Sequence, residues 1–111
     1  MSVTIDRANE VVIIRVPGPR MMYPSLGEFS GAVSGQIVKG ERKLLVDLSA
    51  VSYVDSATIG CLMDLYRQAL AAGAALKLAG VQRRVETMLT LTGAQNFLEI
   101  HADEPSAIQS F

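Results

Sequence analysis

The chain has 111 residues, enough for one compact domain with one hydrophobic core. Half of the residues are hydrophobic and 19% are charged, which is typical of a folded globular protein and excludes a disordered chain. Ten Lys and Arg residues against eleven Asp and Glu residues leave a net charge of -1, without the basic excess that nucleic acid binding requires. We therefore expect a single domain over residues 1–111 that binds no nucleic acid.

The sequence also lacks the signals of a membrane, secreted or metal-binding protein. No apolar run approaches the roughly 20 residues that span a bilayer, although the mean hydropathy is +0.30. The N-terminus carries Asp6 and Arg7 and no apolar segment of a signal peptide. Cys61 is the only cysteine, so an internal disulfide is impossible, and no Cys/His cluster suits a metal. We predict a cytoplasmic protein with no membrane insertion, no metal and no cofactor.

The first third of the chain predicts a β-hairpin followed by a helix. Segments 3–5 and 11–16 are rich in β-branched residues and flank a turn at 6–10, and the unbroken apolar run of the second indicates a strand covered on both faces. Two prolines in 17–19 end the sheet. Apolar residues at helical spacing within 21–38 predict a helix that Ser25 could cap.

The helix predicted within 21–38 contains three glycines four residues apart, at 27, 31 and 35. Each weakens the helix by roughly 1 kcal/mol relative to alanine. Because they share one face, they either let another backbone approach closely or leave a loosely packed surface helix.

The rest of the chain alternates three strands with three helices. The expected strands are 44–48, 75–79 and 96–100, and the expected helices start at Ser56, at Val81 and near Pro105, with Asp103 as a cap of the last. Gly73 and Gly93 are placed to end the first two helices. The order ββαβαβαβα predicts an α/β domain with a mixed, mostly parallel β-sheet, an N-terminal antiparallel hairpin and about four helices.

Asp55 and Ser56 stand where the strand pattern changes into a helical pattern. Both residue types are favoured helix N-caps. A helix N-terminus also favours an anion, and a phosphate on Ser56 would add a charge of about -1.5 to -2 beside Asp55. From the residues alone, two interpretations stay open: a simple cap, or a phosphate acceptor.

Residues that could carry enzymatic chemistry are few. His101 lies in a polar tail, and no cation near Cys61 indicates a reactive thiolate. Ser56 has no GxSxG elbow and a hydrolase would have to recruit the distant His101. No glycine-rich phosphate loop occurs. We expect no enzymatic activity.

Two stretches of the sequence resemble the STAS domain family, specifically the bacterial anti-sigma factor antagonists. These are Leu44-Leu45-Val46-Asp47-Leu48-Ser49 and Val54-Asp55-Ser56-Ala57-Thr58-Ile59-Gly60. Further matches are Ala72-Gly73, Leu78-Ala79-Gly80-Val81 and Leu91-Thr92-Gly93-Ala94. The resemblance covers nearly the whole chain, is weakest over 17–39, and implies a single STAS domain.

The resemblance implies a partner-switching regulator. In the family, the unphosphorylated antagonist binds an anti-sigma factor that is also a serine kinase, which frees the sigma factor. The kinase then phosphorylates the serine after the motif aspartate, here Ser56, and a PP2C-type phosphatase resets the switch. Asp55 would orient the loop or the hydroxyl, and Ala57, Thr58 and Ile59 would complete the partner-binding surface.

Thr58 departs from the glycine that the family usually has at this position. It could narrow the choice of kinase, serve as a second phosphoacceptor, or be a neutral replacement. A further alternative for the whole chain is an accessory STAS subunit of an ABC transporter, or a stressosome-type scaffold, that docks its partner without phosphorylation of Ser56.

Overall fold

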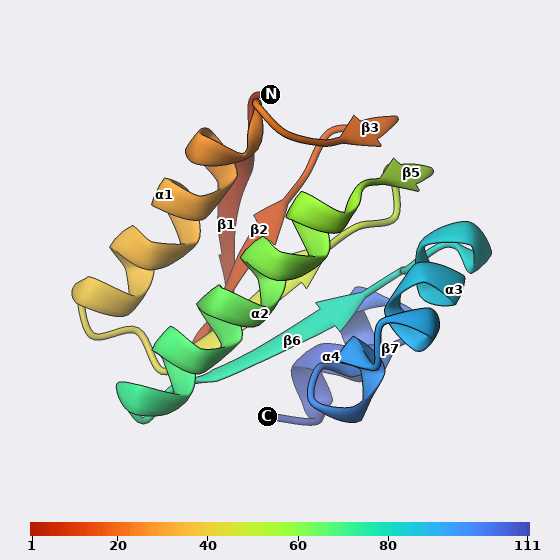
Figure 1. The fold of residues 1–111 in the computed structure, drawn as a ribbon. Helices are drawn as coiled ribbons and strands as arrows, with labels where there is room; N and C mark the ends of the chain where they lie inside the picture. The colour runs from red at the N-terminus through yellow and green to blue at the C-terminus, as the bar shows by residue number, and fades with distance from the viewer.

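The computed structural model describes all 111 residues and forms one five-stranded β-sheet with helices on both faces (Figure 1). The strands are β1 (Thr4–Ala8), β2 (Val11–Arg15), β3 (Arg20–Met21), β4 (Lys43–Asp47), β5 (Tyr53–Val54), β6 (Ala75–Ala79) and β7 (Glu99–His101). The helices are α1 (Leu26–Val38), α2 (Ser56–Ala71), α3 (Arg83–Leu91) and α4 (Glu104–Gln109), with a 3-10 turn η1 (Ala94–Asn96). The predicted order is confirmed, with β3, β5 and η1 added to it.

The main sheet has the strand order β1-β2-β4-β6-β7. β1 and β2 are antiparallel, and every other neighbouring pair in this sheet is parallel. The predicted α/β class with an antiparallel hairpin at the edge is therefore confirmed. β3 and β5 form a separate parallel pair at the carboxyl end of the sheet, and the sequence analysis missed both strands.

The hairpin turn is shorter than predicted. β1 continues to Ala8, and the turn is made by Asn9 and Glu10, with Asn9 at φ 57°. Asp6 and Arg7 belong to the strand because an edge strand tolerates polar side chains, and both find ion-pair partners, Arg15 and Glu41. Polar residues in a strand-forming run therefore did not mark a turn.

The two faces of the sheet are covered unequally. One face packs against α1, α2 and α3 in a core of 24 buried residues (Figure 1). The other face packs a cluster of five buried residues, of which Ala107 comes from α4. All four residues Val11 to Ile14 are buried, which confirms that β2 is covered on both faces.

The three glycines of α1 do not bring another backbone close. Gly27, Gly31 and Gly35 are exposed, and an added Cβ at any of them would meet no atom within 4 Å. The helix buries the opposite side through Leu26, Phe29, Val33 and Ile37. The structure thus favours the surface-helix interpretation.

The chain between α3 and β7 is more irregular than predicted. Gly93 takes a left-handed conformation at φ 79°, and η1 follows it. Asn96 and the exposed Phe97 lie before β7 instead of within it. The expected strand at 96–100 therefore began three residues too early and ended one residue too early. None of the helices has the length and apolar composition needed to cross a membrane.

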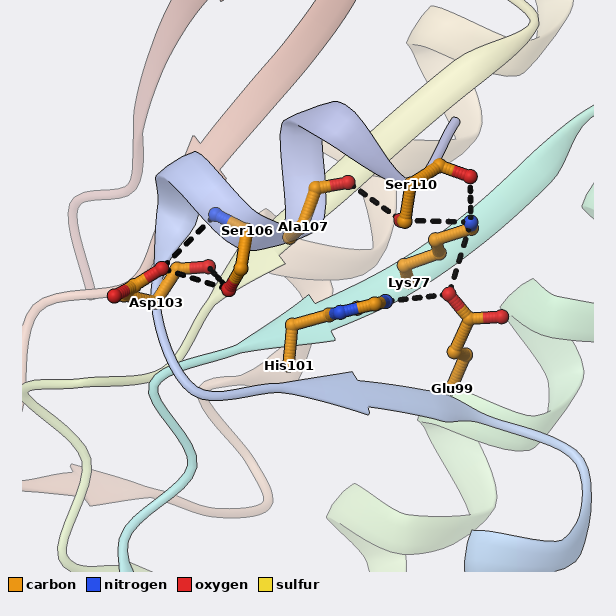
Figure 2. Close-up of polar contacts among 7 residues, drawn as sticks. All are labelled: Lys77, Glu99, His101, Asp103, Ser106, Ala107 and Ser110. Atoms are coloured by element: carbon orange, nitrogen blue, oxygen red, sulfur yellow. Dashed lines mark hydrogen bonds and ion pairs between the residues drawn. The ribbon is translucent and has the colours of Figure 1, made fainter.

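Helix α4 begins at the predicted cap. The Asp103 carboxylate accepts hydrogen bonds from the Ser106 amide at 2.9 Å and from the Ser106 hydroxyl at 2.7 Å (Figure 2). These hydrogen bonds lower the pKa of Asp103. The cap therefore fixes where a helix of only two turns starts.

Lys77 of β6 ties the end of α4 to the sheet (Figure 2). Its Nζ donates to the Ser110 carbonyl at 2.9 Å and to the Ser110 hydroxyl at 2.8 Å, and it pairs with Glu99 at 2.9 Å. The same ammonium lies 4.6 Å from the centre of the Phe111 ring. Lys77, followed by His101, which also contacts Glu99, lowers the pKa of Glu99. Only 12% of the Lys77 side chain is exposed.

Arg15 of β2 ties the start of α4 to the sheet. Its guanidinium binds the Glu104 carboxylate through two hydrogen bonds of 2.8 Å and pairs with Asp6 at 3.1 Å. Burial, followed by a hydrogen bond with Glu104, raises the pKa of Asp47, whereas Arg15 lowers the pKa of Glu104. Asp47 is therefore the more easily protonated of the two carboxyls.

We predict that Lys77→Met lowers the free energy of unfolding by about 1–3 kcal/mol, because Ser110 and Glu99 lose a charged and largely buried donor. Urea unfolding measures the loss, and hydrogen exchange should increase in α4. Lys43→Met is the control, since Lys43 pairs with Glu10, whose side chain is 85% exposed, and should cost at most about 1 kcal/mol. Equal losses in the two variants would show that Lys77 does not anchor α4.

We predict that Asp47→Asn is more stable than the wild type at pH 7. The raised pKa means that ionised Asp47 costs stability as pH rises through its unfolded and folded pKa values. An amide keeps the acceptor for the Ser49 amide and carries no charge. The difference in melting temperature should vanish below about pH 3, where the unfolded Asp47, with a pKa of about 3.9, is also protonated. A variant less stable at pH 7 than the wild type would contradict this account.

Candidate functional site

The segment before Ser56 is held by the small sheet of β3 and β5. The Pro19 carbonyl accepts hydrogen bonds from the Ser52 amide at 2.8 Å and the Tyr53 amide at 3.1 Å. Gly18 lies so close to Ala50 that an added Cβ would stand 1.5 Å from the Ala50 carbonyl oxygen. Only glycine fits at that position, so the loop before β3 packs directly on the loop before β5.

Asp55 is the N-cap of α2, as its residue type predicted. Its Oδ1 accepts from the Thr58 amide at 2.9 Å and lies 2.8 Å from the Thr58 hydroxyl, and its Oδ2 accepts from the Tyr23 amide at 3.1 Å. Burial raises the pKa of Asp55, but the hydrogen bonds from Thr58 and Tyr23 outweigh it, so the net pKa is lowered. Asp55 is therefore a carboxylate at neutral pH and joins the loop after β3 to the first turn of α2.

Ser56 is the first residue of α2 and is exposed. Its hydroxyl makes no hydrogen bond, and Asp55 directs its oxygens to Thr58 and Tyr23 instead. The hydroxyl therefore projects from a turn whose backbone is fixed by neighbouring side chains.

A hollow of about 480 Å³ opens beside Ser56. We call it the Ser56 hollow, and its lining residues are Tyr53, Val54, Asp55, Ser56, Arg84 and Met88. A second hollow of about 500 Å³ shares Tyr53 and Arg84 with the first. Its other lining residues are Pro19, Arg20, Met22 and Ser52. The two hollows flank β5 and extend the surface around Ser56 onto α3.

The five predicted site residues do not all lie on this surface. Ser56 and Ala57 are exposed and Asp55 is half-buried, but Thr58 is 0% exposed and Ile59 is 5% exposed. Ile59 belongs to the main core because the first turn of α2 packs its inner side against the sheet. Of the five, Asp55, Ser56 and Ala57 are accessible on this surface, and Thr58 and Ile59 lie beneath them.

Thr58 has a structural role that the sequence analysis did not foresee. Its hydroxyl lies 2.5 Å from the Met21 carbonyl and 2.8 Å from Asp55 Oδ1, so it bridges β3 and the cap of α2. A fully buried hydroxyl between two acceptors is closed to a kinase. The structure therefore argues against Thr58 as a second phosphoacceptor and against a neutral replacement.

No sequence pattern indicated that Arg84 and Tyr53 line the Ser56 hollow, or that Arg20 lines the hollow next to it. Arg84 is an exposed residue of α3, and its exposure alone does not indicate a functional site. The available signal was topological: α2 follows β4 and α3 follows β6, and the carboxyl ends of parallel neighbours lie at one edge of a sheet. The N-terminal turns of both helices therefore meet there.

The other candidate residues lie apart from this surface. His101 is in β7, contacts Glu99 and does not line either hollow. Burial raises the pKa of the Cys61 thiol, which is opposite to the shift of a reactive cysteine. The structure contains no group of three or more His, Cys, Asp or Glu side chains placed to hold a metal ion. The Ser56 hollow contains no histidine or lysine that could activate the serine.

The fold and this surface together define a small α/β domain that presents the Ser56 hydroxyl at the carboxyl edge of its sheet. The chain belongs to the STAS domain family, whose model matches residues 2–107. No curated protein matches the chain in sequence.

Several solved structures share this fold. An anti-sigma-factor antagonist (STAS) domain protein from Planctomyces limnophilus has a TM-score of 0.89 and 16% identity over 97% of this chain and 96% of that chain. An anti-sigma factor antagonist from Mycobacterium paratuberculosis has a TM-score of 0.88 and 16% identity, over 98% and 92%. The anti-sigma factor antagonist SpoIIAA in its unphosphorylated form has a TM-score of 0.82 and 18% identity over 98% of this chain and 95% of that chain.

The phosphorylated form of the Bacillus cell fate determinant SpoIIAA also matches, with a TM-score of 0.76 and 18% identity over 98% of both chains. At these identities the likeness establishes the fold.

We predict that Thr58→Val lowers the free energy of unfolding by about 1–3 kcal/mol, because the variant keeps the shape but removes the buried donor to Met21. Chemical denaturation measures the change. Thr87→Val is the matched control on an exposed helix position and should stay within about 0.5 kcal/mol. A Thr58→Val variant as stable as the wild type would leave the hydroxyl without a structural role.

Proposed function

We propose that this protein is an anti-sigma factor antagonist controlled by phosphorylation of Ser56. In its unphosphorylated form it binds an anti-sigma factor that is a serine kinase, and this binding releases the sigma factor. Phosphorylation of Ser56 ends the binding, and a PP2C-type phosphatase restores the free hydroxyl. The observation that carries the proposal is the exposed, unbonded hydroxyl of Ser56 on the fixed first turn of α2.

The local structure suits a reversible modification. Asp55 and Thr58 hold the turn with hydrogen bonds that do not involve the Ser56 hydroxyl, so replacing its proton does not break the cap. In the transfer, Ser56 Oγ bonds to the γ-phosphorus of ATP, the bond to ADP breaks, and the hydroxyl proton passes to a base of the kinase. This chain supplies only the acceptor.

A phosphate at Ser56 changes the partner surface mainly through charge. It adds about -1.5 to -2 charges beside Asp55, which is already a carboxylate. Asp55, Ser56 and Ala57 would then present a strongly negative face instead of the single negative charge of Asp55. A partner surface fitted to the unmodified face loses affinity through like-charge repulsion and desolvation of the phosphate.

We predict that the cognate anti-sigma kinase with ATP adds one phosphate to the wild type and none to Ser56→Ala, as measured by intact-protein mass. Ser56→Ala should keep its affinity for the kinase, whereas Ser56→Asp should lose at least about tenfold, or 1.4 kcal/mol. Calorimetry or surface plasmon resonance gives the dissociation constants.

Ala71→Asp is the charge control, because it puts the same charge at the exposed far end of α2, about 22 Å away at 1.5 Å per residue. It should bind as the wild type does. If Ser56→Asp also binds as tightly as the wild type, the phosphorylation switch is wrong. Binding that persists without any phosphate transfer would instead favour an accessory subunit of a transporter or a scaffold.

A further inference from the structure

Arg84 stands beside Ser56 without a partner of its own. It is the second residue of α3, is exposed, and lines both the Ser56 hollow and the hollow next to it. The ion pairs of the protein use other cations, namely Arg7, Arg15, Lys43, Arg67 and Lys77. The Arg84 guanidinium makes no hydrogen bond either, so its positive charge has no partner within the folded chain.

The other charged groups around the two hollows do not neutralise Arg84. Asp55 directs both carboxylate oxygens to Thr58 and Tyr23. Arg20, on β3, adds a second positive charge to the neighbouring hollow. Glu86 is two residues beyond Arg84 on α3, and residues two apart do not face each other on a helix. The hollow beside Ser56 therefore has a free cation on its α3 side.

We infer that Arg84 is the counter-ion of a phosphate carried by Ser56, so that phosphorylation closes a salt bridge between α2 and α3 across the Ser56 hollow. The inference rests on the proposed function, in which Ser56 accepts the phosphate. It adds Arg84 as the residue whose positive charge pairs with that phosphate. A guanidinium binds phosphate oxygens through two parallel hydrogen bonds, a geometry that lysine or a lone helix terminus cannot supply.

The pair gives phosphorylation a second effect besides added charge. In the unphosphorylated protein, Arg84 is a free positive group at the rim of the partner surface. In the phosphorylated protein, Arg84 is occupied by the phosphate, and any partner carboxylate that used it loses its counter-ion. Ser56 and Arg84 already line one hollow, so the pair forms within an existing part of the surface.

The test installs phosphoserine at position 56 of the full chain during translation and titrates it by phosphorus NMR. The second ionisation of a phosphoserine has a pKa of about 6, and a nearby guanidinium lowers it. We expect the phosphate pKa to be higher by at least about 0.5 in Arg84→Gln than in the phosphorylated wild type, with the difference shrinking as salt is added.

Arg83→Gln is the matched control, because Arg83 is the adjacent exposed arginine and lines neither hollow. It should leave the phosphate pKa unchanged. An equal pKa in the wild type and Arg84→Gln, or an equal rise in both arginine variants, overturns the inference. Unmodified Arg84→Gln should melt at the wild-type temperature, which separates the effect from a change in folding.

The encoded phosphoserine also separates this inference from the proposed function, because it needs no kinase. A kinase that leaves Ser56 unmodified, together with an Arg84-dependent phosphate pKa, would count against the proposed function alone. A kinase that modifies Ser56, together with a phosphate pKa independent of Arg84, would count against the salt bridge alone.

Discussion

The surface around Ser56 depends on one interaction, the acceptance of three donors by the Asp55 carboxylate. The Thr58 amide, the Thr58 hydroxyl and the Tyr23 amide all lie within hydrogen-bond distance of it. The Thr58 hydroxyl also reaches the Met21 carbonyl, and its single proton serves one acceptor at a time. This group of contacts joins two loops that are more than 30 residues apart in sequence. Besides it, β3 and β5 are held by their two-residue pairing, the hydrogen bonds to the Pro19 carbonyl and the burial of Met21 and Val54.

In this arrangement, buried residues fix the first turn of α2 and exposed residues form the surface. Thr58 and Ile59 face inward and fix the first turn of α2, and Ser56 and Ala57 face outward on the same turn. A modifying enzyme can therefore reach one hydroxyl without disturbing the packing below it. The cap carboxylate next to that hydroxyl is ionised, so the surface is sensitive to any further negative charge.

The opposite face of the sheet is organised by charge rather than by a large core. Its buried apolar cluster has only five residues, and α4 lies over it between two cations. Arg15 holds Glu104 at the start of the helix, and Lys77 holds Ser110 just beyond its end (Figure 2). This face lies on the far side of the sheet from α2 and α3, so the C-terminal helix completes the fold without taking part in the surface around Ser56 (Figure 1).

The sequence by itself determined the order of strands and helices, the buried β2, the cap at Asp55 and the position of Ser56, because these follow from short-range patterns of apolar, branched and capping residues. Only the tertiary structure decided that Thr58 is buried, that β3 pairs with β5, and that Arg84 lies beside Ser56. Each of these depends on packing between segments about 30 residues apart, which no local pattern encodes. A two-residue strand is too short to show the alternation of apolar and polar residues that marks a strand in sequence. An exposed arginine on a helix has no distinctive sequence pattern, so its role depends on neighbours that only the fold reveals.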